Sequence, residues 1–290
     1  MAKETIFYFE KAGLYTTLQG AGNKGQQHFG LPIGGPMDQT SAKIANWLVG
    51  NEAQAAVLEI TMMGPEIIVK GDCKIAITGA DMSPMLNDKP ISMYKTIAIK
   101  SGSKISFGRL KSGCRTYLAI GGKISENKLW SNNVSYALNN DNFVFNKKIE
   151  QNSSLSFKTN GSVEIKNHVE KRPLLFNNKI DVRVVPGPEY NLFSKQAIKS
   201  FFDNKHYISN QSDRIGYRLR ETLKHCNQNQ EIISSGIIPG TIQVTSSGKA
   251  IILMNDAPTI GGYARIANII STYMDNVAQL KPGDQISFSI

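Results

Sequence analysis

The stretch HFGLPIGGPMDQTSAKIANWLVGN, residues 28–51, specifies its own backbone more tightly than any other part of the chain. It opens on a turn cluster in which glycine supplies positive φ and proline fixes its own φ: Gly30, Pro32, Gly34, Gly35 and Pro36. Asp38 then stands where an N-cap is expected, and apolar residues recur at helical spacing as far as Gly50-Asn51. The pattern predicts a glycine-rich loop delivered onto a helix. Such a loop either holds a ligand or is a tight turn that packs a structural helix.

The composition outside this stretch is typical of a globular chain with many short strands. Hydrophobic residues make up 41% of the 290 residues, enough to bury a sizeable core in one large domain or two of ordinary size. The 25 glycines and 11 prolines are scattered, which favours a loop-rich β structure over a helical bundle. We therefore expect a mostly β fold.

Charge and cysteine content exclude several classes of protein. The net charge of +10 comes from lysines spread along the chain without interleaved aromatics, which indicates a solvated basic surface and no nucleic-acid interface. Cys73, Cys114 and Cys226 form no C-x-x-C pair, so neither a disulfide framework nor a zinc site is expected. The N-terminus is unlike a signal peptide and no apolar run is long enough to span a membrane. We expect a cytoplasmic protein that binds no membrane.

Short β-branched runs bounded by turns predict strands in both halves of the chain: 57–69, 74–78, 96–99, 104–107, 116–120, 181–185, 241–245, 250–254 and 285–289. Helices are predicted at 189–202 and 265–270. Asn and Lys become frequent between residues 123 and 179, and we place a domain boundary near Arg172-Pro173, giving domains of 1–172 and 173–290. Residues 98–107 and 279–288 share a turn and strand pattern, which either reflects two related β domains or is coincidence.

The sequence contains no recognised catalytic motif. Its four histidines lack the spacing of metal ligands, and there is no nucleophile elbow, Walker-type loop or zincin motif. Three polar clusters remain as candidate sites. One is the opening stretch, with Gly35, Pro36 and Asp38.

The second cluster, residues 212–220, combines a carboxylate, an aromatic ring and three guanidinium groups. Arginine grips planar carboxylates or phosphates with two hydrogen bonds, and Asp213 could hold one guanidinium in place. In an extended segment Arg214, Arg218 and Arg220 would face one side, so a concerted anion grip is geometrically possible. The alternative is an Asp–Arg pair that staples a surface turn. Tyr217 lies within the same cluster.

The third cluster, residues 255–263, is a turn that runs into a predicted helix. Gly261 and Gly262 would let backbone amides approach an anion or an oxyanion closely, and the start of a helix would add a favourable dipole, although Gly-Gly turns are also common without function. Asp256 directly follows an apolar strand, a position suited to acid–base work or substrate binding. Thr259 and Tyr263 complete the cluster.

Ordered matches along nearly the whole chain carry a resemblance to a known family. They are LYTTLQ (14–19), GPMD (35–38), ANWLVGN (45–51), LEITMMGP (58–65), ITGA (77–80), RTYLAI (115–120), VVPGPEYNLF (184–193), SDRIGYRL (212–219), GIIPGTIQV (236–244), TIGGYARIA (259–267) and AQLKPGDQISF (278–288). With these segments the chain resembles the allophanate hydrolase subunit 2 family, also described as biotin-dependent carboxyltransferase-like, which includes the C-type subunits of 5-oxoprolinase.

The resemblance implies a fold of two cyclophilin-like β-barrel domains with a few short helices. It also implies a C-type subunit that works with a B-type partner, and with an A-type subunit, to open 5-oxoproline to glutamate at the expense of ATP. Two alternatives stay open: a catalytically degenerate module that pairs with a kinase-inhibitor-like B-type partner, and a urea-carboxylase-type carboxyltransferase, which would use biotin. With 290 residues and no biotin-carboxylase or biotin-carrier domain, carboxyltransfer would need other chains.

On this interpretation Asp256 and Asp38 are the candidate catalytic residues, and no metal ligand is assigned. The residues expected to bind substrate or an anion are Arg214, Arg218, Asp213, Tyr217, Thr259, Gly261, Gly262, Tyr263, Gly35 and Pro36.

The sequence departs from the family pattern mainly in its first half. After LYTTLQ the family has an acid and then Gly-Arg, whereas this chain has Gly20, Ala21 and Gly22-Asn23. A family Gly-Ser-Arg-Ser-Thr run is replaced at residues 130–135, with Asn133 among them, so a second arginine is lost. The anion-handling residues of the first domain are therefore depleted, while those of the second are better preserved.

Overall fold

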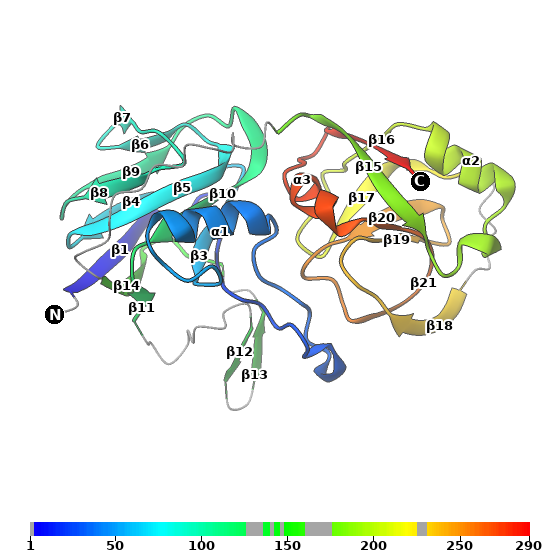
Figure 1. The fold of residues 1–290 in the computed structure, drawn as a ribbon, viewed down its shortest axis with the longest axis horizontal. Helices are drawn as coiled ribbons and strands as arrows, with labels where there is room; N and C mark the ends of the chain where they lie inside the picture. Colours follow the sequence, from blue (N-terminus) through cyan, green and yellow to red (C-terminus); the bar gives the residue numbers. More distant parts are fainter. Residues whose placement is uncertain (1–2, 126–135, 140–141, 146–147, 160–175, 225–230) are drawn as a thin grey trace. The chain divides into compact units, whose positions relative to one another are not determined.

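The computed structural model describes residues 3–125, 136–139, 142–145, 148–159, 176–224 and 231–290. The chain forms two compact units, each of which is described by itself (Figure 1). Unit 1 comprises Met1–Asn23 and Gly34–Phe176, and unit 2 comprises Lys24–Ile33 and Asn177–Ile290. The predicted boundary at Arg172-Pro173 lies outside the described residues, so the division at residue 172 stays a prediction.

Unit 1 consists of two main sheets, a small hairpin and one α-helix among its described residues. The seven-stranded sheet has the order β11 (Lys123–Ile124), β14 (Ser153–Thr159), β1 (Lys3–Lys11), β4 (Glu66–Lys70), β9 (Lys104–Phe107), β6 (Pro84–Leu86) and β7 (Lys89–Pro90). The five-stranded sheet has the order β2 (Tyr15–Gln19), β3 (Val57–Thr61), β10 (Ser112–Ile120), β5 (Cys73–Asp81) and β8 (Thr96–Ile99). A hairpin, β12 (Tyr136–Asn139) and β13 (Asn142–Phe145), and the helix α1 (Gln39–Leu48) complete the unit.

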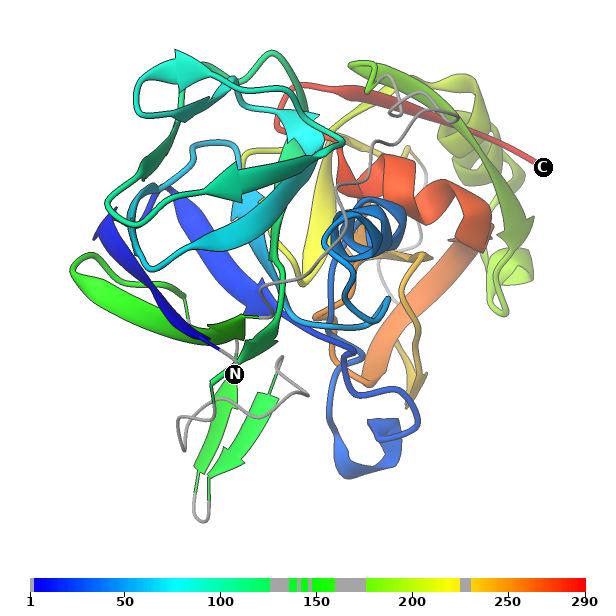
Figure 2. The same cartoon turned by 60° about the vertical axis from the view of Figure 1, so that its left-hand side comes forward.

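The two faces of the five-stranded sheet have different roles, which follow from the alternation of side chains along each strand. In β3, Leu58 and Ile60 point into the core shared with the seven-stranded sheet. Their neighbour Val57 faces the other way and packs with Ala45 and Leu48 of α1. Figure 2 shows the strands of unit 1 from a second side, with α1 outside them. The polar residues that alternate with the core positions therefore lie on the α1 face.

Unit 2 is an eight-stranded, nearly closed sheet. Its strand order is β16 (His206–Tyr207), β22 (Gln285–Ser289), β15 (Lys179–Pro186), β21 (Ile260–Ile269), β19 (Thr241–Val244), β20 (Lys249–Leu253) and β17 (Gly216–Thr222), with β18 (Glu231–Gly236) paired to β21. An isolated bridge between Ile208, directly after β16, and Leu219 of β17 joins the two ends of this order. Ser209 N–H also donates to Arg218 O at 2.8 Å, so the two ends of the sheet meet and the barrel is nearly closed.

The helical segments described in unit 2 are short. They are the 3₁₀ turns η1 (Gln27–Phe29), η2 (Tyr190–Leu192) and η3 (Ser271–Tyr273), and the helices α2 (Lys195–Asp203) and α3 (Met274–Ala278). Phe201 of α2 stacks on Phe288 of β22 with ring centroids 4.5 Å apart, which fixes the helix against the barrel. The mostly β prediction with a few short helices is confirmed.

Two helix predictions are corrected by the structure. Residues 265–270, predicted as a helix, belong mainly to β21, because this segment pairs with β19 on one side and β15 on the other, and two ladders outweigh local propensity. Residues 189–202, predicted as one helix, are η2 followed by α2. The break falls at Ser194, whose hydroxyl accepts the amide of Ala197 at 3.1 Å and so starts α2 at Lys195.

Candidate functional site

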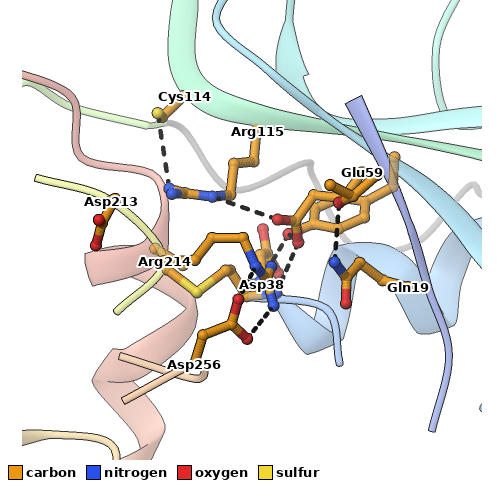
Figure 3. Close-up of polar contacts among 12 residues, drawn as sticks. Gln19, Asp38, Glu59, Cys114, Arg115, Asp213, Arg214 and Asp256 are labelled. Atoms are coloured by element: carbon orange, nitrogen blue, oxygen red, sulfur yellow. Dashed lines mark hydrogen bonds and ion pairs between the residues drawn. The ribbon is translucent and has the colours of Figure 1, made fainter. Parts of the chain in front are cut away.

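A buried polar cluster lies on the α1 face of the five-stranded sheet in unit 1. Glu59 of β3 is 0% exposed and stands directly opposite Thr17 of β2 and Tyr117 of β10. Its Oε2 accepts a hydrogen bond from the Tyr117 hydroxyl at 2.9 Å, and its Oε1 lies 3.6 Å from Arg115 Nε (Figure 3). Arg115 is 3% exposed, so the ion pair is enclosed in protein. A carboxylate in such a place needs partners, because the desolvation of an unpaired charge costs several kcal/mol.

The turn before α1 is tied to the same cluster. Met37 N–H donates to Glu59 Oε2 at 2.8 Å, and Asp38 N–H donates to the Tyr117 hydroxyl oxygen at 2.8 Å. The Asp38 carboxylate accepts the Ser41 amide at 2.9 Å and the Ser41 hydroxyl at 2.6 Å. Asp38 is therefore the N-cap that the sequence predicted, with φ −100° and ψ 94°. Its predicted catalytic role stays a prediction.

Burial keeps two tyrosine hydroxyls of this face protonated. Burial, reinforced by the negative charges of Glu59 and Asp38, holds the pKa of Tyr117 well above its usual range. Burial also raises the pKa of Tyr94 to about 12, and its hydroxyl accepts the amide of Gly79 at 2.9 Å. Both rings consequently act as hydrogen-bond donors and acceptors rather than as phenolates.

Gly35 and Pro36 lie in the turn that leads into α1, and the predicted loop before a helix is confirmed. Gly35 has φ 75°, and a Cβ there would lie 3.1 Å from the carbonyl oxygen of Gly20. Any other residue would be strained in both respects. Asn23, at one of the departures from the family pattern, is 5% exposed, and the replaced run at residues 130–135 lies outside the described residues.

In unit 2 the structure brings Arg214 and Asp256 together. Arg214 Nε donates to Asp256 Oδ2 at 2.7 Å and Nη2 donates to Oδ1 at 2.8 Å (Figure 3). The Asp256 amide also donates to the Arg214 carbonyl at 3.0 Å, so the backbone ladder of β17 and β20 continues as far as this pair. The side chains are 4% and 8% exposed, respectively. Two predicted site residues thus form one bidentate ion pair.

The rest of the 212–220 cluster differs from the prediction. Asp213 holds no guanidinium among the described residues; its Oδ1 accepts the amides of Ile215 and Gly216 at 2.8 and 3.1 Å and shapes the turn. The concerted grip by three arginines is wrong, because Arg214 precedes β17 and is buried, whereas Arg218 and Arg220 are exposed on the strand. Tyr217 is 2% exposed and donates to the Ala278 carbonyl at 3.3 Å, which gives it a packing role.

Gly261 and Gly262 lie in β21 and not at the start of a helix, so the predicted dipole contribution is wrong. A Cβ on Gly261 would lie 2.6 Å from Gln243 Nε2, and Gln243 Nε2 itself donates to the Tyr263 carbonyl at 3.2 Å. The end of the Gln243 side chain therefore packs against Gly261, and a side chain at this position would have to displace it. Thr259 is half-buried and the Tyr263 ring is 42% exposed.

A second ion pair in unit 2 links two of the family motifs. Arg265 Nε donates to Glu189 Oε2 at 2.6 Å and Nη2 donates to Oε1 at 2.5 Å. Arg265 also donates to the carbonyl oxygen of Gly236 at 2.8 Å. The hydrogen bonds from Arg265 hold the pKa of Glu189 below its usual range. The pair ties η2 and β18 to β21.

Sequence reasoning did not single out Glu59, Arg115, Tyr117, Glu189 or Arg265. A usable signal was present: each is a polar residue inside a motif that is otherwise apolar or turn-forming. A charge at a strand position that alternation assigns to the interior indicates a buried pair. Among the described residues no group of three or more His, Cys, Asp and Glu is arranged to hold a metal ion, and no helix is long and apolar enough to cross a membrane.

Comparisons with known proteins agree with this architecture. The family model described as "Carboxyltransferase domain, subdomain A and B" matches residues 29–290. The C-type subunit of 5-oxoprolinase from Escherichia coli (strain K12) is 33% identical over 96% of this chain and 89% of its own length. That of Haemophilus influenzae is 30% identical over 94% of this chain and 87% of its own length.

Solved structures have the same fold. The protein TTHA0988 superposes with a TM-score of 0.86 at 24% identity, over 100% of this chain and 57% of that one. The urea carboxylase of Kluyveromyces lactis superposes with a TM-score of 0.83 at 27% identity, over 98% of this chain and 27% of its own. The chain thus spans little more than half of the first structure and about a quarter of the second. The resemblance of the motifs is confirmed, and the chain belongs to the carboxyltransferase domain family, subdomains A and B.

Proposed function

We propose that this chain is the C-type subunit of an ATP-dependent 5-oxoprolinase, which converts 5-oxoproline, ATP and water to L-glutamate, ADP and phosphate. It acts with a B-type partner and an A-type subunit. The observation that carries the proposal is the 33% identity with the C-type subunit of E. coli 5-oxoprolinase over nearly the whole of both chains. The buried clusters support it, because family motifs that are distant in sequence converge on them within each unit.

The chemistry of this reaction suits the residues present. A ring amide resists hydrolysis, and transfer of the ATP γ-phosphoryl group to the amide oxygen creates a leaving group. A first water then adds to the activated carbon and the ring C–N bond breaks, which gives the amine and an acyl phosphate. A second water displaces phosphate from the acyl phosphate and leaves the carboxylate of glutamate. Such a site must bind the substrate carboxylate and stabilise an oxyanion. In unit 1 the turn of Gly35, Pro36 and Asp38 is proposed to contact the substrate where it leads into the ten-residue helix α1, whose N-terminus holds the Asp38 carboxylate.

In unit 2 the proposed roles fall on the ion pair and its surroundings. Asp256 is proposed as the acid–base group, held by Arg214. Arg218, exposed on β17, is proposed to bind an anion, and Thr259 and Tyr263, at the start of β21, are proposed to contact the substrate.

Reconstitution with authentic B- and A-type partners tests the proposal. ATP-dependent release of glutamate is measured for the wild type and for Asp256→Ala, Asp256→Asn and Asp38→Asn. Asp203→Asn, an exposed position at the end of α2, is the matched control. We expect turnover in the wild type and the control, and loss of at least about a hundredfold in the Asp256 variants, the usual size of an acid–base contribution. Absence of turnover with authentic partners would refute the proposal.

Carboxyltransfer from carboxybiotin is a second candidate function, favoured by the similarity to the K. lactis urea carboxylase. It predicts incorporation of labelled bicarbonate into urea when the chain is supplied with a biotinylated partner and ATP. The third candidate is a binding module without catalysis, favoured by Gly20 and Asn23, where the family has charged groups. It predicts a stable complex with the B-type partner that binds 5-oxoproline and never turns it over.

A further inference from the structure

Glu59 is a buried carboxylate of the five-stranded sheet that is bonded to the turn before α1. The residue is 0% exposed, and it alternates along β3 with Leu58 and Ile60, which fill the core. Replacement of the whole Glu59–Arg115 ion pair by apolar residues would avoid the desolvation of two charges, so stability alone is a weak reason for this pair. The backbone amides that the Glu59 carboxylate binds give a better reason for the glutamate.

Glu59 holds two successive backbone amides of the Gly35 to Asp38 turn. It accepts the Met37 amide directly at 2.8 Å. It reaches the Asp38 amide through Tyr117, whose hydroxyl accepts from Asp38 N–H at 2.8 Å and donates to Glu59 Oε2 at 2.9 Å. These bonds form a directed chain from the turn through the phenol to the carboxylate. This series of hydrogen bonds needs a protonated Tyr117 hydroxyl and an acceptor oxygen on Glu59.

The turn that is held in this way is built on two glycines, which leave its backbone many alternative conformations. Gly34 and Gly35 have φ of 63° and 75°, and the N-cap Asp38 is extended before the helix begins. The first amides of a helix have no partner within the helix, so their direction depends on what is bonded to the residues just before it. Two buried bonds therefore set the direction in which the turn and the first amides of α1 present themselves.

We infer that Glu59 and Tyr117 are a positioning pair that keeps the Gly35 to Asp38 turn in the conformation that binds the substrate. The inference rests on the proposed function for the identity of that substrate. It assigns Tyr117 no contact with the reacting atoms. The pair acts by holding the backbone, so its loss weakens binding and leaves the chemical step nearly intact.

Two measurements on Tyr117→Phe and Glu59→Gln test the pair, with Thr5→Val as the control. Thr5 is also 0% exposed and hydrogen-bonded, but it lies in the seven-stranded sheet. In the isolated chain, residue-resolved hydrogen exchange reports the two amides. We expect Tyr117→Phe to speed the exchange of the Asp38 amide by about tenfold and to leave that of Met37 at its wild-type rate, because only the Asp38 bond runs through the phenol. Glu59→Gln should speed both.

In the reconstituted complex, the KM for 5-oxoproline should rise about tenfold in Tyr117→Phe while kcat stays within about twofold of the wild type. Thr5→Val should change neither. If the Asp38 amide exchanges at its wild-type rate in Tyr117→Phe, the inference that Tyr117 holds the turn is overturned. If the wild type is active and the KM of Tyr117→Phe is unchanged, the inference that the pair supports substrate binding is overturned. A wild type that turns over no 5-oxoproline refutes the proposed function instead, and the exchange rates then decide on the positioning pair alone.

Discussion

Arg214 donates two hydrogen bonds to the carboxylate of Asp256, Nε to Oδ2 at 2.7 Å and Nη2 to Oδ1 at 2.8 Å, across the end of the β17–β20 ladder. Both side chains are more than nine-tenths buried. Their mutual arrangement matters for the interpretation of any variant, because the removal of either partner leaves the other as an unpaired buried charge.

We predict that Asp256→Ala lowers the free energy of unfolding by about 3 kcal/mol, the usual cost of breaking a buried pair. Urea unfolding of the isolated chain measures it. The double variant Arg214→Met/Asp256→Leu should recover much of the loss, because it removes both charges together. A single variant as stable as the wild type would show that solvent replaces the missing partner. Activity lost in Asp256→Ala therefore has to be compared with Asp256→Asn, which keeps one oxygen for Arg214.

Variants of Asp38 can separate an effect on stability from an effect on catalysis. Its carboxylate caps α1 through the Ser41 amide at 2.9 Å, and an N-cap contributes about 1 kcal/mol. We predict that Asp38→Ala loses about that amount in urea unfolding, whereas Asp38→Asn, which keeps a capping oxygen, loses less than half of it. If Asp38→Asn also keeps its turnover in the reconstituted complex, the proposed catalytic role of Asp38 is excluded and the residue is a cap.

Much of the fold could be predicted because the strands carry their own pattern. The run at residues 285–289 was predicted as a strand and is β22, with the same bounds. The turn before it also matches the repeat: Asp284 N–H donates to Lys281 O at 3.0 Å, as Ser103 N–H donates to Lys100 O at 3.1 Å before β9. Local sequence was misleading at residues 265–270, where partners from β15 and β19 decide the structure.

The candidate site was harder to predict, because its members come together only through strand register. Glu59 is isolated in an apolar strand, and nothing local indicates that Thr17 and Tyr117 stand opposite it. The role of Asp38 as the N-cap of α1 was predictable, since capping depends on residues that are close in sequence. Asp213 was misassigned because a carboxylate next to an arginine in sequence bonds more readily to the amides of its own turn.

Gly79 is predicted to be intolerant of a side chain. It has φ 82°, and a Cβ at this position would lie 2.4 Å from the Arg115 carbonyl oxygen across β5 and β10. Gly79→Ala should therefore destabilise unit 1 by about 2 kcal/mol or more, from backbone strain and the clash together. The control is Gly102→Ala, whose φ of 85° carries the same strain with no atom within 4 Å of the Cβ. Equal losses of stability in urea would mean that the close approach of the strands contributes nothing.

His206 is predicted to make unit 2 sensitive to acid. Its ring is 0% exposed between Phe201 and Phe288, and its Nε2 lies 2.8 Å from the Phe201 carbonyl oxygen. Burial lowers the pKa of His206 below its usual range, and it outweighs the opposing effects of the Phe201 carbonyl and of the Glu221 carboxylate, which lies 3.9 Å from Nδ1. The neutral ring is therefore the form that the folded state favours.

The sign of the pH effect follows from this. An unperturbed histidine titrates at a pH of about 6.5, so as the pH falls below this value the unfolded chain takes up the proton before the folded chain does. The free energy of unfolding therefore decreases as the pH falls from that value toward the lower pKa of His206 in the folded state. We predict that the free energy of unfolding falls by about 1 kcal/mol more between pH 7 and pH 5 in the wild type than in His206→Gln. The glutamine can still donate to Phe201 O but does not titrate. Parallel pH profiles for the two proteins would show that other groups cause the loss.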